Sequence, residues 1–441
     1  MEESRSPIHD IVNALWRALV ALGAPVATAE VERWGFTIHA ALSAFGREFH
    51  NHDHVIGLVE EGDALEVIAA LYHDAVYIQV DHGPPPAMAA QLANVLAPGP
   101  DGWRILPGAD APAARDVLAV FGRQVGDVVT PTTGLNELAS ALVAALQLEA
   151  ALGREDRIAI AACIEQTIPF RVDPVPELHA RLAGLGLTGD VLSIATRRAV
   201  RLGNRDVENF AENDAARFLD NTWKLLPESN PALHAPMVYT VRDYRIALHK
   251  MESFLGWLPA DRVFHAWEDE PRPELHARRV ARATGNLALA VRYLRAKLYS
   301  ISLVESIAAL TGGDVPLDYF MGGRKPVRPL PIRRLEQFLP TLPMAADVDH
   351  ALHRLLAEGR ASESSFDTGP SPLGAFLHAT CGERQVMRGF EAARAHWAAG
   401  GEPLAFLEAQ PRVVIAAIAR AAAEIMPARA AVLRTLADRF A

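Results

Sequence analysis

The chain has few cysteines and no long uninterrupted apolar run. Cys163 and Cys381 are its only cysteines among 441 residues, and they lie far apart in apolar segments with helical spacing. No disulfide framework and no Cys/His pair of a thiol enzyme is indicated, so we expect two reduced, buried thiols in a cytoplasmic protein. Because no run of about 18 apolar residues occurs, no membrane span is expected. Asn13 and Arg17 interrupt the first apolar segment, which predicts an amphipathic helix and not a signal peptide.

Aromatic residues and positive charge are also scarce. Aromatic residues make up 7% of the chain, and the formal net charge is −10. An acidic chain is poorly suited to binding a nucleic-acid backbone, so we expect no nucleic-acid partner. Gly312-Gly313-Asp314 is not followed by the Gly-Lys-Ser/Thr of a P-loop, and no Gly-x-Ser-x-Gly elbow occurs. What the sequence has in abundance is Ala and Leu, which favour helices and supply a large core.

The apolar residues are arranged with helical spacing in nearly every segment between the glycine and proline turns. We find no strand-like alternation and no repeat of fixed period, so we predict an all-α protein. The expected helices span residues 9–22, 28–46, 51–60, 64–77, 135–152, 154–167, 176–185, 188–203, 206–225, 239–258 and 273–310.

Proline content suggests how the chain is divided. Residues 78–132 contain eight prolines, and we predict an irregular insertion there with short helices near 87–96 and 113–122. Residues 325–334 are rich in Pro and Arg and are typical of a linker. We therefore expect a helical domain at 1–260 that includes the insertion, a helical extension at 261–330 and a C-terminal helical region at 331–441.

Two short histidine motifs are the main functional signal. Phe49-His50-Asn51-His52-Asp53-His54-Val55 precedes Leu71-Tyr72-His73-Asp74-Ala75-Val76-Tyr77, and His73 follows His54 by 19 residues. On one helix, His50 and His54 would share a face. The apolar residues before His73 would bury the His-Asp dyad, and a buried ionised Asp is costly unless it is paired or bound to a metal. Imidazole and carboxylate groups suit divalent Mn, Fe, Co, Ni, Zn or Mg, so we predict a site for one or two such ions.

A fourth ligand is expected from a later helix. Asp190, Asp206, Asp214 and Asp220 are the acidic residues of that region. Asp206 is the preferred candidate, because the apolar segment around it must pack inward. Asp214 and Asp220 are better interpreted as solvated residues.

These motifs resemble those of the HD superfamily of metal-dependent phosphohydrolases, in particular small bacterial proteins predicted to be HD phosphohydrolases. The resemblance covers roughly residues 30–260; the proline-rich insertion departs from the pattern, and residues 265–441 match no motif of the family. The His-Asn-x-x-His element is also similar to that of cyclic-nucleotide phosphodiesterases. The matching elements are Phe49-His50-Asn51-x-x-His54-Val55, Tyr72-His73-Asp74-Ala75-Val76-Tyr77, Asn136-Glu137-x-x-Ser140-Ala141, the distal Asp206, and Tyr239-x-x-Arg242-x-Tyr244.

The resemblance implies an HD-type helical bundle in which His54, His73, Asp74 and Asp206 hold one divalent ion, with Asp74 able to bridge to a second. A hydroxide on that ion would attack the phosphorus of a small phosphate ester such as a nucleotide. Asp74 is thus also a catalytic candidate. His50 would protonate the leaving oxygen, or would only support the ligands from outside.

Three further residues have both a functional and a plain interpretation. Glu137 would bind a water of the site, or would be an acid placed at a helix N-terminus by the helix dipole. Arg47 and Arg242 would bind a substrate phosphate. The alternative is a surface residue for Arg47 and a salt bridge to Asp243 or Glu252 for Arg242.

The sequence is also compatible with two function classes other than a phosphohydrolase. One is a catalytically silent HD-fold module that senses a nucleotide or binds a protein. The other is an HD-fold di-iron oxygenase, which would need extra histidine ligands such as His82. The size of the C-terminal half favours a homo-oligomer or a protein partner that uses the C-terminal helices.

Overall fold

The computed structural model describes residues 6–323 and 332–441, so most of the expected linker at 325–334 lies outside the described residues. The chain forms two compact units. Unit 1 contains residues 1–211 and 259–284, and unit 2 contains residues 212–258 and 285–441. The predicted boundaries near 260 and 330 are therefore wrong: residues 212–258 belong with the C-terminal half, and a later segment returns to the first unit. The reason is tertiary packing, which leaves no mark in local composition.

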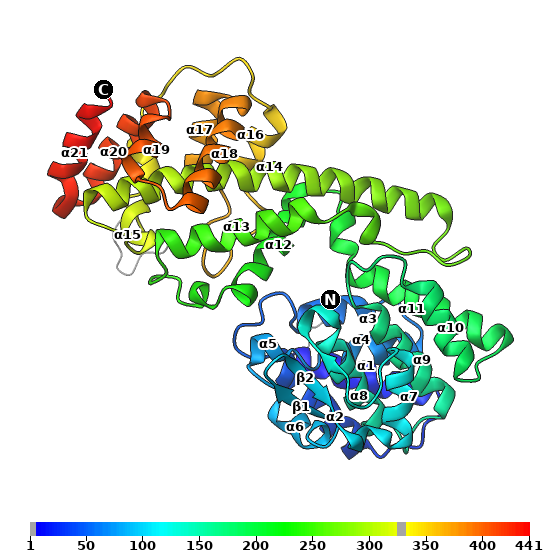
Figure 1. The fold of residues 1–441 in the computed structure, drawn as a ribbon. Coiled ribbons are helices and arrows are strands. Elements are labelled where there is room, and N and C mark those ends of the chain that lie inside the picture. Colours follow the sequence, from blue (N-terminus) through cyan, green and yellow to red (C-terminus); the bar gives the residue numbers. More distant parts are fainter. Residues whose placement is uncertain (1–5, 324–331) are drawn as a thin grey trace. The chain divides into compact units, whose positions relative to one another are not determined.

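Unit 1 is built mainly from helices, in agreement with the predicted fold class (Figure 1). Asparagine and aspartate side chains start two of the helices that matter for the site: Asn51 caps α3, and Asp63 caps α4. The helices of this part are α1 (Pro7–Ala21), α2 (Thr28–Leu42), α3 (His52–Val59), α4 (Ala64–Tyr72), α5 (Ile78–Asp81), α6 (Pro86–Leu92), α7 (Pro112–Val120), α8 (Leu135–Gln147), α9 (Arg154–Gln166), α10 (Val175–Gly184) and α11 (Gly189–Asp206).

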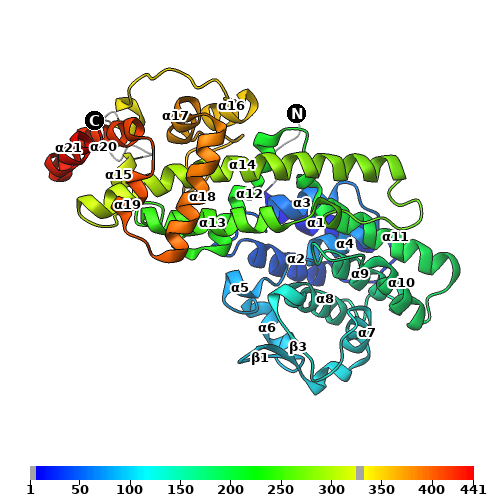
Figure 2. The ribbon, with the colours of Figure 1, turned by 45° about the horizontal axis from the view of Figure 1, so that its top comes forward.

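A central helix, α9, organises the core of unit 1. It packs against α4, α8 and α11, while α1 packs on α2 and α4; Figures 1 and 2 show these helices alongside one another. Gly203 allows the close approach of α11 to α9, because a Cβ at this position would lie 2.7 Å from the Gln166 carbonyl oxygen. The apolar faces predicted from the sequence meet in one continuous core.

The proline-rich insertion contains the only strands among the described residues. β1 (Leu96–Gly99), β2 (Gly102–Ile105) and β3 (Val128–Val129) form an antiparallel sheet in the order β1-β2-β3. The expectation of no strands is wrong here, since strands of two to four residues are too short to show alternation. The two short helices predicted in the insertion correspond to α6 and α7.

Unit 2 consists of helices in the described residues. The helix predicted at 206–225 is wrong in its start, because the chain leaves α11 at Asp206 and begins again where Asp214 caps α12 through the Ala216 N–H at 2.9 Å. α14 begins in unit 1 and continues into unit 2. The helices are α12 (Ala215–Ser229), α13 (Val241–Trp257), α14 (Pro273–Thr311), α15 (Leu317–Met321), α16 (His350–Glu358), α17 (Pro372–Cys381), α18 (Glu383–Ala399), α19 (Pro403–Glu408), α20 (Arg412–Ile425) and α21 (Ala430–Arg439).

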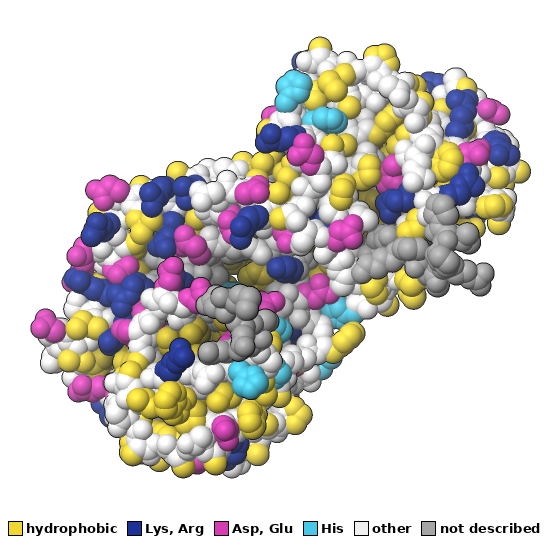
Figure 3. All heavy atoms as spheres, turned by 180° about the vertical axis from the view of Figure 1, so that it is seen from behind, with side chains coloured by type: hydrophobic (Ala, Val, Ile, Leu, Met, Phe, Trp, Pro, Cys, Tyr) yellow, Lys and Arg dark blue, Asp and Glu magenta, His cyan; other side chains and the backbone are white. Residues whose placement is uncertain are grey.

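Two features relate to the expectation of no nucleic-acid partner and no membrane span: the distribution of surface charge and the character of the helices. On the face shown in Figure 3, basic and acidic side chains are interspersed, so this face has no extended basic area. None of the helices in the described ranges combines the length and apolar character that crossing a lipid bilayer requires.

Candidate metal centre

The His73-Asp74 dyad lies where α4 ends. The helix predicted to reach residue 77 stops at Tyr72, and His73 is its C-cap. The turn that follows directs the Asp74 carboxylate back toward the imidazole, with His73 Nε2 3.0 Å from Asp74 Oδ2. Both side chains therefore reach the same point.

His54 reaches the dyad from α3. Asn51 fixes the start of this helix, since its side-chain oxygen accepts the Asp53 N–H at 2.9 Å and the His54 N–H at 3.4 Å. His50 therefore precedes the helix, and the prediction that it stacks on His54 within one helix is wrong. The two rings are nevertheless 6.0 Å apart, and the His50 ring also contacts Tyr77 with centroids 4.6 Å apart. His50 lies beside the centre.

Asp206, the last residue of α11, completes the group. Its Oδ1 lies 3.0 Å from His54 Nε2 and 3.4 Å from His73 Nε2. One ligand atom each of His54, His73 and Asp74 lies within 4.8 Å of the other two. The four side chains are at most 15% exposed. The structure thus brings together the four predicted ligands, which come from α3, from the C-terminal end of α4 with the turn after it, and from α11, and which are up to 152 residues apart in the chain.

Two atoms of this group lack the hydrogen bonds that burial demands. His73 Nε2 and Asp74 Oδ2 are buried and have no hydrogen-bond partner among the described residues, although they lie 3.0 Å apart. The other ring nitrogen, Nδ1 of His73, is 2.7 Å from the Ala70 carbonyl oxygen. Donation of this N–H to Ala70 leaves the Nε2 lone pair directed at the centre, as in histidine ligands of metal sites.

The electrostatics of the group show mutual stabilisation of opposite charges. Burial opposes charging of His73, but the carboxylates of Asp74 and Asp206 outweigh it and hold the pKa of His73 well above its usual value. Burial likewise opposes ionisation of Asp206, but the hydrogen bond to His54 and the nearby imidazole of His73 lower its pKa to about 2. The pKa of Asp74 is lowered too, because the neighbouring histidines outweigh burial. Two ionised carboxylates therefore face two imidazoles, a donor set that divalent transition metals prefer.

Glu137 is at the N-terminal end of α8, near this group. Its Oε2 is buried without a hydrogen-bond partner among the described residues. Burial, together with the charges of Asp74 and Asp206, raises the pKa of Glu137 to about 7. Glu137 is thus a buried carboxyl group close to the predicted ligands, and its binding of a water stays a prediction.

Two other residues of the same motif hold the backbone that follows Asp74. Ser140 Oγ accepts the Val76 N–H at 3.0 Å, and Asn136 Oδ1 accepts the Ile78 N–H at 3.1 Å. The sequence placed both residues in a motif but gave them no role. Their role is to fix the turn that carries Asp74.

The structure does not support a phosphate-binding role for Arg47. Its side chain is fully buried and donates to both carboxylate oxygens of Asp81, at 3.0 and 2.5 Å. A third bond, 2.6 Å long, goes to the backbone carbonyl oxygen of Asp74. Arg47 is therefore a brace that supports the predicted ligands from behind, and its guanidinium is engaged with groups of the chain. Sequence reasoning missed its partner Asp81, because no local pattern links residues 34 positions apart.

Arg242, the second predicted phosphate ligand, belongs to unit 2, whereas the metal group belongs to unit 1. Its side chain is 67% exposed and lies 3.8 Å from Glu305. The residue is thus in a surface ion pair, but its partner is Glu305 and not the expected Asp243 or Glu252.

Comparison with family models, with curated proteins and with solved structures finds no match for this chain.

Proposed function

We propose that unit 1 is a metal-dependent phosphohydrolase that acts on a small phosphate ester such as a nucleotide. One observation carries the proposal: two imidazoles and two carboxylates converge, and two of their buried ligand atoms have no hydrogen-bond partner among the described residues. Buried polar atoms without partners are costly, and a bound cation removes that cost. The HD-type motifs that carry these residues are consistent with the same chemistry.

The residues present fit one divalent ion. His54, His73, Asp74 and Asp206 would hold it, and Mn, Fe, Co, Ni, Zn and Mg all accept nitrogen or oxygen ligands. Such an ion, when bound, polarises a phosphoryl oxygen and lowers the pKa of a water. The carbonyl of Ala70 keeps His73 in the tautomer that such binding requires.

The remaining chemistry belongs to the chain itself. Glu137, whose pKa is raised to about 7, is suited to take a proton from a water near neutral pH. His50 lies next to His54 and stacks edge-on against Tyr77, which orients its ring. An imidazole in this place is suited to protonate a leaving oxygen. Neither Arg47 nor Arg242 is assigned to the substrate.

The decisive experiment measures the metal content of the purified protein by mass spectrometry. The variants are Asp74→Ala and Asp206→Ala, and the matched control is Asp53→Ala. His52-Asp53 is also a His-Asp dipeptide, but the Asp53 side chain is 85% exposed and pairs only with His52 at 3.2 Å. We expect one or two ions per chain in the wild type and the control, and strong loss in both site variants. Phosphate release from a panel of nucleotides, assayed with the same metal, should follow the metal content.

The outcomes separate the function classes. Absence of metal from every protein, even after reloading, would refute the proposal. Bound metal without phosphate release from any substrate would favour a nucleotide-sensing or interaction module. Two irons with oxygen consumption would favour an oxygenase.

A further inference from the structure

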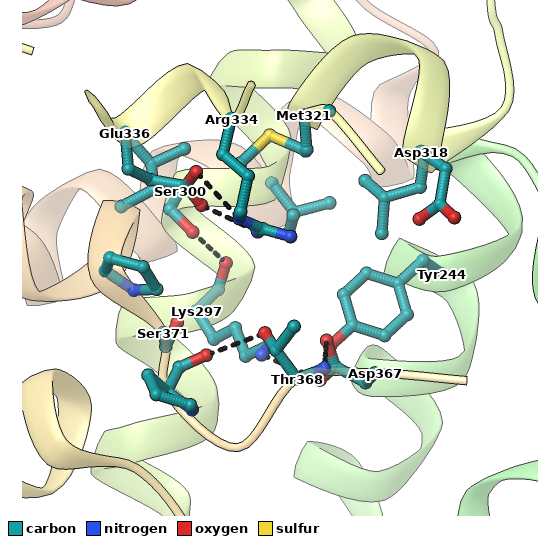
Figure 4. Close-up of a pocket in the computed structure, with 16 residues that line it drawn as sticks. Tyr244, Lys297, Ser300, Asp318, Met321, Arg334, Glu336, Asp367, Thr368 and Ser371 are labelled. Atoms are coloured by element: carbon teal, nitrogen blue, oxygen red, sulfur yellow. Dashed lines mark hydrogen bonds and ion pairs between the residues drawn. The ribbon is translucent and has the colours of Figure 1, made fainter. Parts of the chain in front are cut away.

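Unit 2 contains a pocket that the phosphohydrolase hypothesis does not use (Figure 4). Its walls come from α13, α14 and α15, from the loops before and after α16, and from the start of α17. In Figure 4, Arg334 reaches into the pocket from one side, and Tyr244, Lys297 and Asp367 lie on the other. The pocket is lined by polar and charged side chains as well as by Ile301, Leu317, Met321 and Leu373.

A buried charge cluster forms the floor of this pocket. One oxygen of Asp367, Oδ2, accepts from Trp223 Nε1 at 2.9 Å, Tyr244 Oη at 2.5 Å, Lys297 Nζ at 2.9 Å and Arg360 Nη1 at 3.4 Å. Lys297 and Arg360 are 4% and 5% exposed. One carboxylate therefore faces two buried cations, and burial of an excess charge is unfavourable unless a further anion balances it.

The opposite wall presents an unused hydrogen-bond donor. Arg334 binds Glu336 through Nε at 3.3 Å and Nη2 at 3.0 Å. Its third nitrogen, Nη1, is buried and has no hydrogen-bond partner among the described residues. The guanidinium is thus held in place by Glu336 with one edge left for a ligand.

Two carboxylates of the pocket, Glu336 and Asp367, are engaged with donors of the chain. Both oxygens of Glu336 bind Arg334, and Asp367 uses its second oxygen, Oδ1, for the Thr368 N–H at 2.9 Å. Asp318 also lines the pocket, and in the view of Figure 4 the Tyr244 ring lies between it and Lys297. Around Lys297 and Arg334, the groups that remain for a ligand are therefore donors.

We propose that this pocket of unit 2 binds a small oxyanion, a phosphate or a carboxylate group, between Arg334 and Lys297. Charge-assisted hydrogen bonds from an arginine and a lysine are the usual means of holding such a group. The site is separate from the metal centre and does not depend on it, and its ligand would regulate or stabilise unit 2.

The test is isothermal titration calorimetry of the full chain with inorganic phosphate and, separately, with acetate, at matched chloride concentration. All proteins carry Asp74→Ala and are treated with a chelator, so that the metal centre contributes no binding. The test variant is Arg334→Gln. The matched control is Arg384→Gln, which also removes an arginine paired with a carboxylate, Asp347 at 3.0 Å, but does not line the pocket.

We expect saturable binding of phosphate or acetate that Arg334→Gln weakens about tenfold or more, with no change in the Arg384→Gln control. Lys297→Met is the second variant, should Arg334→Gln fail to fold, and the same loss is expected. Absence of binding of both anions, or binding that neither Arg334→Gln nor Lys297→Met weakens, would overturn the proposal. The anion that binds more tightly identifies the phosphate or the carboxylate as the natural group.

Discussion

Replacement of Arg47 by Met distinguishes the brace seen in the structure from the phosphate ligand expected from the sequence. The side chain is fully buried and is bonded to both oxygens of Asp81. Its loss leaves Asp81, whose side chain is 8% exposed, as a buried charge without its cation. Removal of one partner of a buried ion pair costs about 3–5 kcal/mol. For a unit of this size, that is a fall in Tm of roughly 6–20 °C.

The assay is urea unfolding of the chelator-treated protein followed by circular dichroism, with metal affinity as a second readout. Arg33→Met is the matched control, because Arg33 pairs with Glu30 at 3.0 Å on an exposed helix surface, and its loss should cost less than about 1 kcal/mol. The double variant Arg47→Met/Asp81→Leu should recover much of the stability. Metal affinity should fall as well, since Arg47 also holds the Asp74 carbonyl. A loss below about 1 kcal/mol for Arg47→Met, combined with a raised KM, would refute the brace and restore the phosphate role.

Three further results are expected. In metal-free protein, the raised pKa of Glu137 means that its contribution to stability is complete below about pH 4.5 and is lost as pH rises through about 7. Urea unfolding should therefore show Glu137→Gln to be more stable than wild type at pH 8, by up to about 3 kcal/mol. At pH 4.5 the two proteins should have nearly the same stability. Ser140→Ala leaves the Val76 N–H without its acceptor, so the same assay should show a loss of about 1–3 kcal/mol, and equal stability would contradict the bond. Burial raises the pKa of both thiols, and that of Cys381 is raised to about 11. Because little thiolate is present at pH 8, a thiol reagent should modify Cys381 slowly, and buried Cys163 only after unfolding.

Much of the metal group was predictable because its ligands lie in short local motifs. His54, His73 and Asp74 fall within a stretch of the sequence where helical spacing and an apolar context already indicate burial. Asp206 was harder, because only the inward-packing segment around it favoured it over the other acidic candidates. In the structure its Oδ1 lies 3.0 Å from His54 Nε2.

The failures have a common physical cause. A helical stacking of His50 on His54 and a helix over residues 64–77 both assumed uninterrupted helices, but Asn51 caps α3 after His50 and α4 ends at Tyr72. A helix cap involves only two or three residues, whereas helical periodicity is judged over ten or more residues. A prediction from periodicity therefore misses where a cap ends the helix. Arg47 was misassigned because its partner Asp81 is distant in the chain.

The sequence alone determined the helical character of the protein and indicated the residues of its candidate metal centre, because helical spacing and motif chemistry are local properties. Tertiary structure alone decided the division of the chain into two units and the convergence of His54, Asp74 and Asp206 from three segments. It also decided the buried Asp367 cluster of unit 2. Those features depend on contacts between residues that are far apart in the chain. The energies of such contacts cannot be inferred from a short stretch of sequence.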